Sequence, residues 1–124
     1  MSFESELKAH IDADGTVTGL IQSRFHPVRL PEGVTLPAAT YQRVGGGPRN
    51  SLDGFTNGLT NVLLQIDIWA RTPDAAREIA AAISARMNTM TTTLRSVLQS
   101  EDDDYEPETK LFRIIQQYSC WHSQ

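Results

Sequence analysis

The segment that decides the fold is "LTNVLLQIDIWARTPDAAREIAAAISARM", residues 59–87. Apolar and polar residues alternate over 59–71, so that one side of the strand carries Val62, Leu64, Ile66 and Ile68. Gln65 and Asp67 fall on the other side. The pattern predicts a strand with one buried face and one wetter face, as in an antiparallel sheet.

The same segment continues into the clearest helix of the chain, expected over residues 72–90. Thr72 is a favoured N-cap, Pro73 suits the first helical position, and Asp74 complements the helix dipole. Apolar residues recur every three or four positions at Ala76, Ile79, Ala80, Ile83, Met87 and Met90. This stripe has little side-chain volume, which favours a helix lying close against a sheet.

The flanking segments complete an α+β pattern. A helix is expected over 3–13, where Phe3, Leu7 and Ile11 share a face and Gly15 follows in the position that ends helices. A weaker helical piece is expected over residues 17–22. Strands are expected over 23–33 (irregular, at an edge because of Pro27), 38–45, 92–101 and 110–122.

The order of these elements predicts the architecture. Helix, strands, helix and strand pair indicate an α+β fold in which two helices pack on one face of a mainly antiparallel sheet. In the last strand, the core-facing side chains are expected to be Phe112, Ile114, Tyr118 and Cys120. The chain of 124 residues is expected to form one domain, 1–124.

Composition excludes several classes of protein. No apolar run approaches the roughly 20 residues of a membrane-spanning helix, and the first residues lack the features of a secretory signal. The single cysteine excludes an intramolecular disulfide framework and fits a reducing cytosol. A net charge of −4 argues against nucleic-acid capture as the main role.

The motifs that could carry chemistry are incomplete. "GGGPRNS" lacks the spacing of a phosphate-binding loop, and the acidic run 101–108 lacks a calcium-loop pattern and is expected to be a solvated hairpin tip. Cys120 and His122 share a strand face, but two further zinc ligands are missing. We expect a buried thiol and a surface histidine there.

Catalysis is not predicted either. A nucleophilic cysteine needs an exposed, electropositive surrounding, whereas Cys120 is expected in the core. The acid–base pairs that can be written are chance pairs of surface residues: Asp67 with Arg71, and Asp53 with Arg49. The sequence therefore predicts no enzyme, no cofactor and no metal.

A long loop is predicted over residues 45–60, between two central strands. Loops of this length are uncommon in compact domains unless they are functional. Small residues dominate it, while Arg49, Asp53 and Phe55 offer charge and an apolar anchor for a partner.

Two tryptophans complete the set of candidate contact residues. Trp69 and Trp121 each end a strand at the parity opposite to the expected core face. Partial burial beneath a loop and an anchoring role at a protein interface, where tryptophan is enriched, are both open.

The sequence also resembles a known family over nearly its whole length. The features that carry the resemblance are "MSFESELKAHIDAD", "RFHPVRLPEGVTLPAATYQRVGGGP" followed by "SLDG", "LLQIDIWARTPDAAREIAAAI" and "DDDYEPETKLFRIIQQYSCWH". They resemble the phage tail-completion family, the tail-terminator-like proteins of long-tailed phages and gene-transfer agents. The match is poorest over residues 89–100.

The resemblance implies a fold and a role. The fold is a twisted sheet packed by two helices, and the role is a virion subunit that forms a ring, expected to be a hexamer, capping the tail tube and joining it to the head. Partners would be copies of the chain, the tail tube protein and a head-side connector or stopper, with DNA only passing through the channel and no membrane. The subunit would lie in the tail or neck of the virion, and in the host cytoplasm during assembly. A head-side connector or stopper role, and a small cytosolic dimeric ligand-binding or regulatory protein, are the alternatives.

Overall fold

The computed structural model describes residues 3–50, 56–89 and 94–123, with the backbone alone for 46–50, 56–60 and 123. Its elements in chain order are α1 (Phe3–Asp12), α2 (Gly15–Ile21), β1 (Phe25–Pro27), β2 (Ala38–Asn50), β3 (Thr56–Ala70), α3 (Pro73–Met87), β4 (Leu94–Glu106) and β5 (Leu111–Ser123). The predicted α+β class is therefore confirmed. Among the described residues no helix is long and apolar enough to cross a bilayer.

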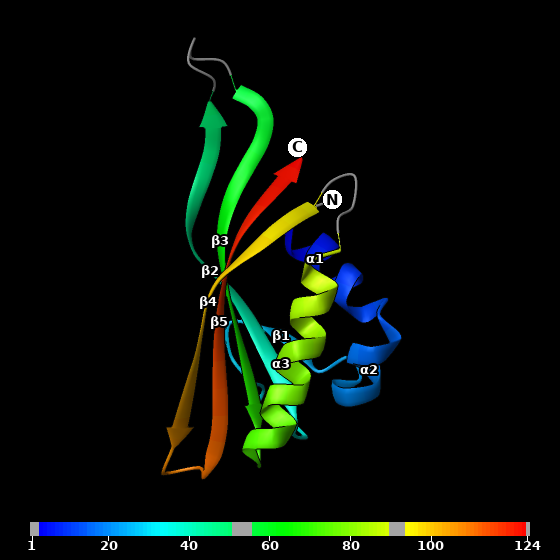
Figure 1. The fold of residues 1–124 in the computed structure, drawn as a ribbon, viewed down its shortest axis with the longest axis vertical. Helices are drawn as coiled ribbons and strands as arrows, with labels where there is room; N and C mark the ends of the chain where they lie inside the picture. The colour runs from blue at the N-terminus through cyan, green and yellow to red at the C-terminus, as the bar shows by residue number, and fades with distance from the viewer. Residues whose placement is uncertain (1–2, 51–55, 90–93, 124) are drawn as a thin grey trace.

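The five strands form one sheet in the order β1-β2-β3-β5-β4. β1 pairs with β2 in parallel, and every other neighbouring pair is antiparallel. Figure 1 shows α1, α2 and α3 on one side of this twisted sheet, with α3 running along it. We call the side away from the helices the outer face.

The core lies between the helices and the sheet. The alternation of β3 places Leu64, Ile66 and Ile68 against α3, each fully buried, as the sequence predicts. The apolar stripe of α3 is buried from Ala76 to Met87. Burial of these side chains is the main source of stability, at about 25 cal/mol per Å² of apolar surface.

One polar side chain is completely buried in this core. Gln116 donates to the Ala80 carbonyl oxygen (3.0 Å) and to Glu101 Oε1 (2.8 Å), and its own Oε1 accepts from the Tyr118 hydroxyl (2.7 Å). Buried amides are tolerated when their hydrogen bonds are satisfied. Gln116 thereby ties β5 to both α3 and β4.

The first helical region contains two helices. The weaker helical piece predicted over 17–22 is α2, so the described chain has three helices where the predicted architecture counted two. The Asp14 side chain accepts hydrogen bonds from Thr16 N (2.8 Å) and Val17 N (3.1 Å) and so caps a new helix. Gly15, expected to end the first helix, instead begins α2. An aspartate N-cap satisfies amides that have no partner within the helix, which accounts for the restart.

The predicted loop 45–60 is largely wrong, since most of it is paired strand. The ladder between β2 and β3 continues from Gly45↔Leu63 to Asn50↔Thr56, with register shifts at Arg43/Gly45 and Pro48/Asn50. The first shift inserts one extra residue, Val44, into β2, as a β-bulge does. The second leaves one residue of β2 opposite three residues of β3, and the pairing continues past both shifts. We call this extension the hairpin arm. Figure 1 shows it projecting beyond the end of the helical layer.

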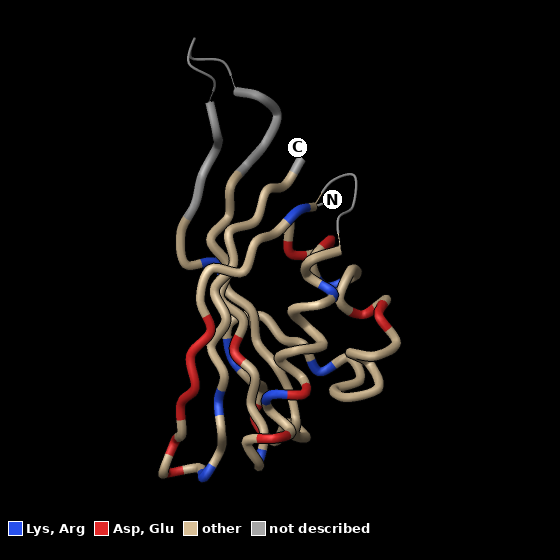
Figure 2. The backbone as a smooth tube through the Cα atoms, in the orientation of Figure 1, with Lys and Arg blue, Asp and Glu red and all other residues tan. Residues whose placement is uncertain are grey.

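The acidic run was also predicted as a hairpin tip, but most of it is strand. β4 continues through Glu106, and the turn to β5 lies at 107–110. The side chains from Glu101 to Asp104 are exposed, as predicted, and form a continuous acidic stretch along this edge of the sheet (Figure 2).

Candidate assembly surface

The outer face carries a charged cluster built by two neighbouring strands. Asp67 on β3 and Arg113 on β5 form an ion pair of 2.8 Å, and Gln65 donates to Asp67 Oδ1 at 3.0 Å. The Asp67 side chain is only 9% exposed. The sequence predicts Asp67 on the wetter face of the sheet. Asp67 does lie on the outer face, but its side chain is buried there, so the expected exposure is wrong. Its partner is Arg113, not the Arg71 considered from sequence.

Trp69 belongs to the same cluster. The Arg113 guanidinium carbon lies 4.8 Å from the centre of its ring, and Asp104 on β4 lies 3.8 Å from the other side of the guanidinium. The Trp69 side chain is half-buried, and its Nε1 has no hydrogen-bond partner among the described residues. Stacking of arginine on an aromatic face stabilises both groups and orders this end of the outer face.

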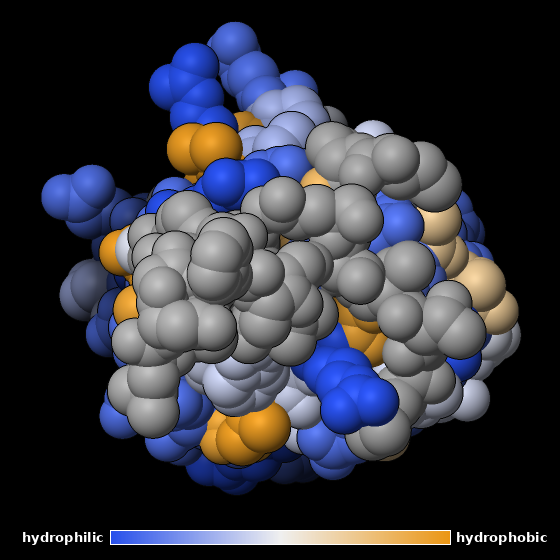
Figure 3. All heavy atoms as spheres, turned by 90° about the horizontal axis from the view of Figure 1, so that it is seen from above, coloured by the Kyte–Doolittle hydropathy of each residue, from blue (hydrophilic) through white to orange (hydrophobic). Residues whose placement is uncertain are grey.

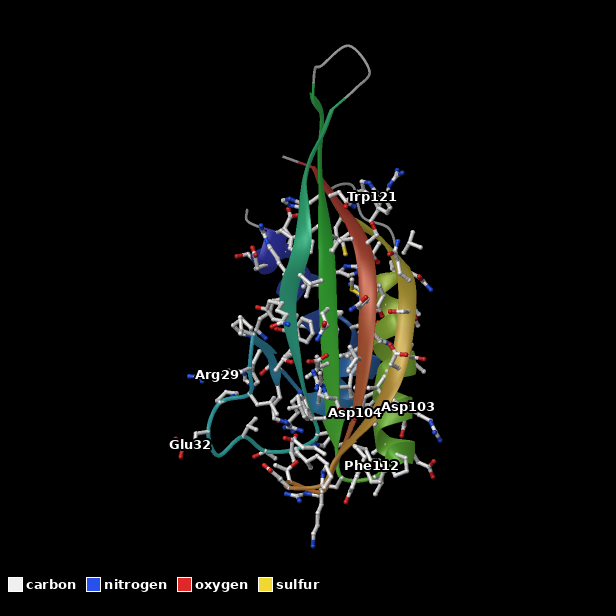
Figure 4. The ribbon with its side chains drawn as sticks, turned by 90° about the vertical axis from the view of Figure 1, so that its left-hand side faces the viewer. Arg29, Glu32, Asp103, Asp104, Phe112 and Trp121 are labelled. Atoms are coloured by element: carbon white, nitrogen blue, oxygen red, sulfur yellow. The ribbon has the colours of Figure 1, made fainter. Side chains whose placement is uncertain are left out.

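Trp121 lies near the opposite end of the outer face (Figure 4). It is half-buried and sits across the ladder from Asn61 on β3 and Arg95 on β4. The two tryptophans thus share a face without touching the same cluster. Their role as interface anchors stays a prediction.

The three candidates from the predicted loop are placed only in part. The backbone of Arg49 lies in β2 near the end of the hairpin arm, and its side chain is not described. Asp53 and Phe55 lie outside the described residues.

Exposed apolar residues form a second feature that the sequence analysis missed. Leu63 and Val97 are 37% and 53% exposed, and both lie across the ladder from Ser119 of β5. Val44, the residue inserted by the β2 bulge, is 46% exposed and adjoins Gly45, which pairs with Leu63. A valine at an outward-facing position of an otherwise polar strand was the available signal. Viewed from the arm end, other exposed hydrophobic side chains appear singly among hydrophilic ones (Figure 3).

A shallow groove of about 630 Å³ lies between the start of α3 and the β4–β5 hairpin. Its floor includes Tyr105 and Phe112, whose rings lie 4.9 Å apart, and its rim carries the exposed Arg77–Asp103 pair at 3.6 Å. The two carboxylates that line it, Asp103 and Asp104, are each within ion-pair distance of an arginine of the same groove, Arg77 and Arg113. The groove is therefore a surface feature without evident chemistry.

Cys120 and His122 both face the helices. Cys120 is fully buried, as predicted, and burial raises the pKa of its thiol to about 12, so the thiol is protonated at neutral pH. His122, predicted at the surface, is buried instead: its Nε2 lies 2.5 Å from Glu6 Oε2, and Phe3 packs edge-on against its ring. Helix α1 covers it, which local sequence around residue 122 could not reveal.

Metal binding has no support in the described part of the chain. No group of three or more histidine, cysteine, aspartate or glutamate side chains there is arranged to hold an ion.

These observations define a class of protein. The described part of the chain presents a sheet with one face free of helices, a projecting hairpin arm and exposed apolar side chains, which are features of a protein that assembles with other chains. A family model described as Tail completion protein gp17 matches residues 5–123. The chain belongs to this tail completion family, as the resemblance predicts, and its role is that of a structural protein of a phage-type tail.

A solved structure supports the same fold. The chain is similar to a chain in the structure titled "Virion of native gene transfer agent (GTA) particle", with a TM-score of 0.77 and 11% sequence identity, covering 99% of this chain and 96% of that one. Likeness at such low identity shows the fold. A search of curated proteins found no match.

Proposed function

We propose that the protein is a ring-forming tail completion subunit that caps the finished tail tube and joins it to the head. The observation that carries the proposal is the hairpin arm, which extends the central strands β2 and β3 beyond the helical layer (Figure 1). An arm of paired strands at one end of a small domain can reach a neighbouring copy or the layer below in an assembly. Membership of the tail completion family supports this use of it.

The proposed partners follow from this role. Copies of the chain form the ring, which we propose to be a hexamer, with the tail tube protein on one side and a head-side connector or stopper on the other. DNA passes through the channel without being bound in a dedicated site, which suits a net charge of −4. The subunit is made in the host cytoplasm and ends in the virion, and its function requires no turnover.

The test removes the arm and leaves the domain. Deleting residues 47–57 joins Gly46 to Gly58, and both strands retain their pairing from Gly46↔Val62 onward, so the monomer should fold. As a matched control, residues 107–110, which form the turn at the opposite end of the sheet, are replaced by an Asn-Gly turn.

Particles assembled with each variant as the only source of the chain are counted by electron microscopy. We expect the arm deletion to give tails of abnormal length or tails without heads, and the turn exchange to give normal particles. Normal particles from the arm deletion would contradict the proposal.

A further inference from the structure

Two edges of the sheet lack a strand partner. β1 covers β2 only at Ala39–Tyr41. From Gln42 to Gly47, the edge of β2 that points away from β3 therefore pairs with no strand among the described residues. β4 forms the other edge, and over Arg95–Ser100 the described part of the chain offers it β5 as its one strand partner. Such open edges are templates for pairing with another chain.

The two open segments lie at the same level of the sheet. Following the ladder across the strands, Gln42 is aligned with Ser100, through Gln65 and Gln117. At the other end of the segments, Gly47 is aligned with Arg95 through Asn61 and Trp121. A copy placed beside the first can therefore meet it without a shift along the strands.

The two open segments also have the same length, because each contains one extra residue at a bulge. Val44 is the extra residue between Arg43 and Gly45 of β2, and Gln99 is the extra residue between Leu98 and Ser100 of β4. Each edge thus uses the same number of residues over the same rows.

The strand directions are compatible. β2 and β3, β3 and β5, and β5 and β4 are all antiparallel, so β2 and β4 run in opposite directions. Copies related by rotation about an axis along the strands would present β4 of one to β2 of the next in antiparallel orientation. Joining two different edges is a heterologous contact, which closes into a ring when the rotation allows.

Outside these two segments, both edges of the sheet are prevented from pairing with another strand. At the level of Ala39 and Tyr41 the β2 edge is covered by β1, and at the same level the β4 edge carries the acidic residues from Glu101 to Asp103. Charge on an edge strand and cover by another segment both prevent pairing. The open rows hold no Asp or Glu; of their two arginines, Arg43 pairs with Glu4 of α1 and Arg95 lies at the last row. Val44 and Val97, 46% and 53% exposed, lie in these rows on opposite edges.

We propose that copies of this chain join edge to edge, with Gln42–Gly47 of one copy pairing antiparallel to Arg95–Ser100 of the next. This inference rests on the proposed ring and specifies the surface that closes it. In this register Val97 of one subunit lies opposite Gly45 of its neighbour, next to the bulge residue Val44. The outer faces join into one continuous sheet.

The first test is covalent trapping in assembled particles. The double variant Gly45→Cys with Val97→Cys places the two cysteines in one row of the proposed pairing. It is oxidised in purified particles and resolved on a denaturing, non-reducing gel; Cys120 is buried and does not compete. Facing residues of an antiparallel pair lie about 4.5–5.5 Å apart at Cα, within disulfide reach. We expect a ladder of multimers, whereas each single variant gives no ladder. The control is Val28→Cys with Val97→Cys, because Val28 is 64% exposed but follows β1 and lies outside the open rows.

The outcomes separate this inference from the proposed function. A ladder from the double variant alone supports the edge pairing. Incorporation of the chain into particles without a ladder overturns the pairing and leaves the proposed function standing. Absence of the chain from finished particles overturns both.

A second test uses the two different edges in solution. Val44→Lys blocks one edge and Val97→Lys blocks the other, so neither variant can extend beyond its blocked side. By native mass spectrometry we expect each variant alone to be monomeric and an equimolar mixture to form a dimer that grows no further, while Val28→Lys assembles as wild type does. A mixture that stays monomeric while wild type forms rings would overturn the heterologous pairing.

Discussion

The ion pair between Asp67 and Arg113 should contribute measurably to stability, although an alternating strand pattern assigns Asp67 to the wetter face. Asp67→Ala removes a carboxylate whose side chain is 9% exposed and which accepts from both Arg113 (2.8 Å) and Gln65 (3.0 Å). The variant leaves Arg113 with the more distant Asp104 carboxylate, 3.8 Å away, and with the Trp69 ring.

The magnitude lies between two limits. Removing one partner of a fully buried ion pair costs roughly 3–5 kcal/mol, and exposed pairs are worth about 0–1 kcal/mol. Because the Arg113 side chain is 27% exposed and keeps two other contacts, we expect Asp67→Ala to lower the free energy of unfolding by about 2 kcal/mol. For a domain of this size that corresponds to a melting temperature lower by roughly 6–8 °C.

The assay is urea unfolding of Asp67→Ala, Arg113→Ala and the double variant. The double-mutant cycle should give a coupling energy of about 1–2 kcal/mol. Asp102→Ala removes an exposed carboxylate from the neighbouring edge strand and should change stability by less than about 0.5 kcal/mol. If Asp67→Ala is as mild as Asp102→Ala, the cluster is an ordinary surface pair and the reasoning fails.

Ile66→Asp should prevent folding, because it places an unpaired charge at a fully buried position and costs several kcal/mol. Circular dichroism measures the effect, and a cooperative melt near that of wild type would contradict the assigned core. The free energy of unfolding should fall as pH rises from about 9 to about 12, since burial raises the pKa of Cys120 to about 12 and the folded state keeps a proton that the unfolded chain releases. Urea midpoints across that range should decline less for Cys120→Ser, which should itself cost about 1–2 kcal/mol; equal declines would exclude the thiol as a source. Glu6→Ala should speed amide exchange in α1 by leaving the buried His122 without its partner, and unchanged exchange there would show that the pair does not hold the helix.

Local periodicity predicted the central elements well because its cause is local. The alternation over 59–71 and the stripe over 72–90 each require that one side of a short segment be buried, and α3 and β3 bury those sides. The core orientation of Cys120 follows from the same parity. The family resemblance, carried by an ordered set of short segments, is confirmed by the match over residues 5–123.

The errors occur where distant segments meet. Glycines over 45–50 were read as loop, but β3 supplies their hydrogen-bond partners, and at Gly45 the strands approach so closely that an added Cβ would lie 3.2 Å from Leu63 Cδ1. His122 was expected at the surface, and a helix from the other end of the chain, through Glu6, covers it.

The sequence by itself determined the central strand and the helix after it, which side of β3 and α3 is buried, and the family to which the chain belongs, since all of these reside in order and spacing along the chain. Only the tertiary structure decided that Asp67 is buried, because its partner Arg113 lies 46 positions away and is brought opposite by the pairing of β3 with β5. The same is true of the two open edges. Strand order and register place β2 and β4 at opposite sides and at one level, and both are properties of a folded sheet that no local pattern contains.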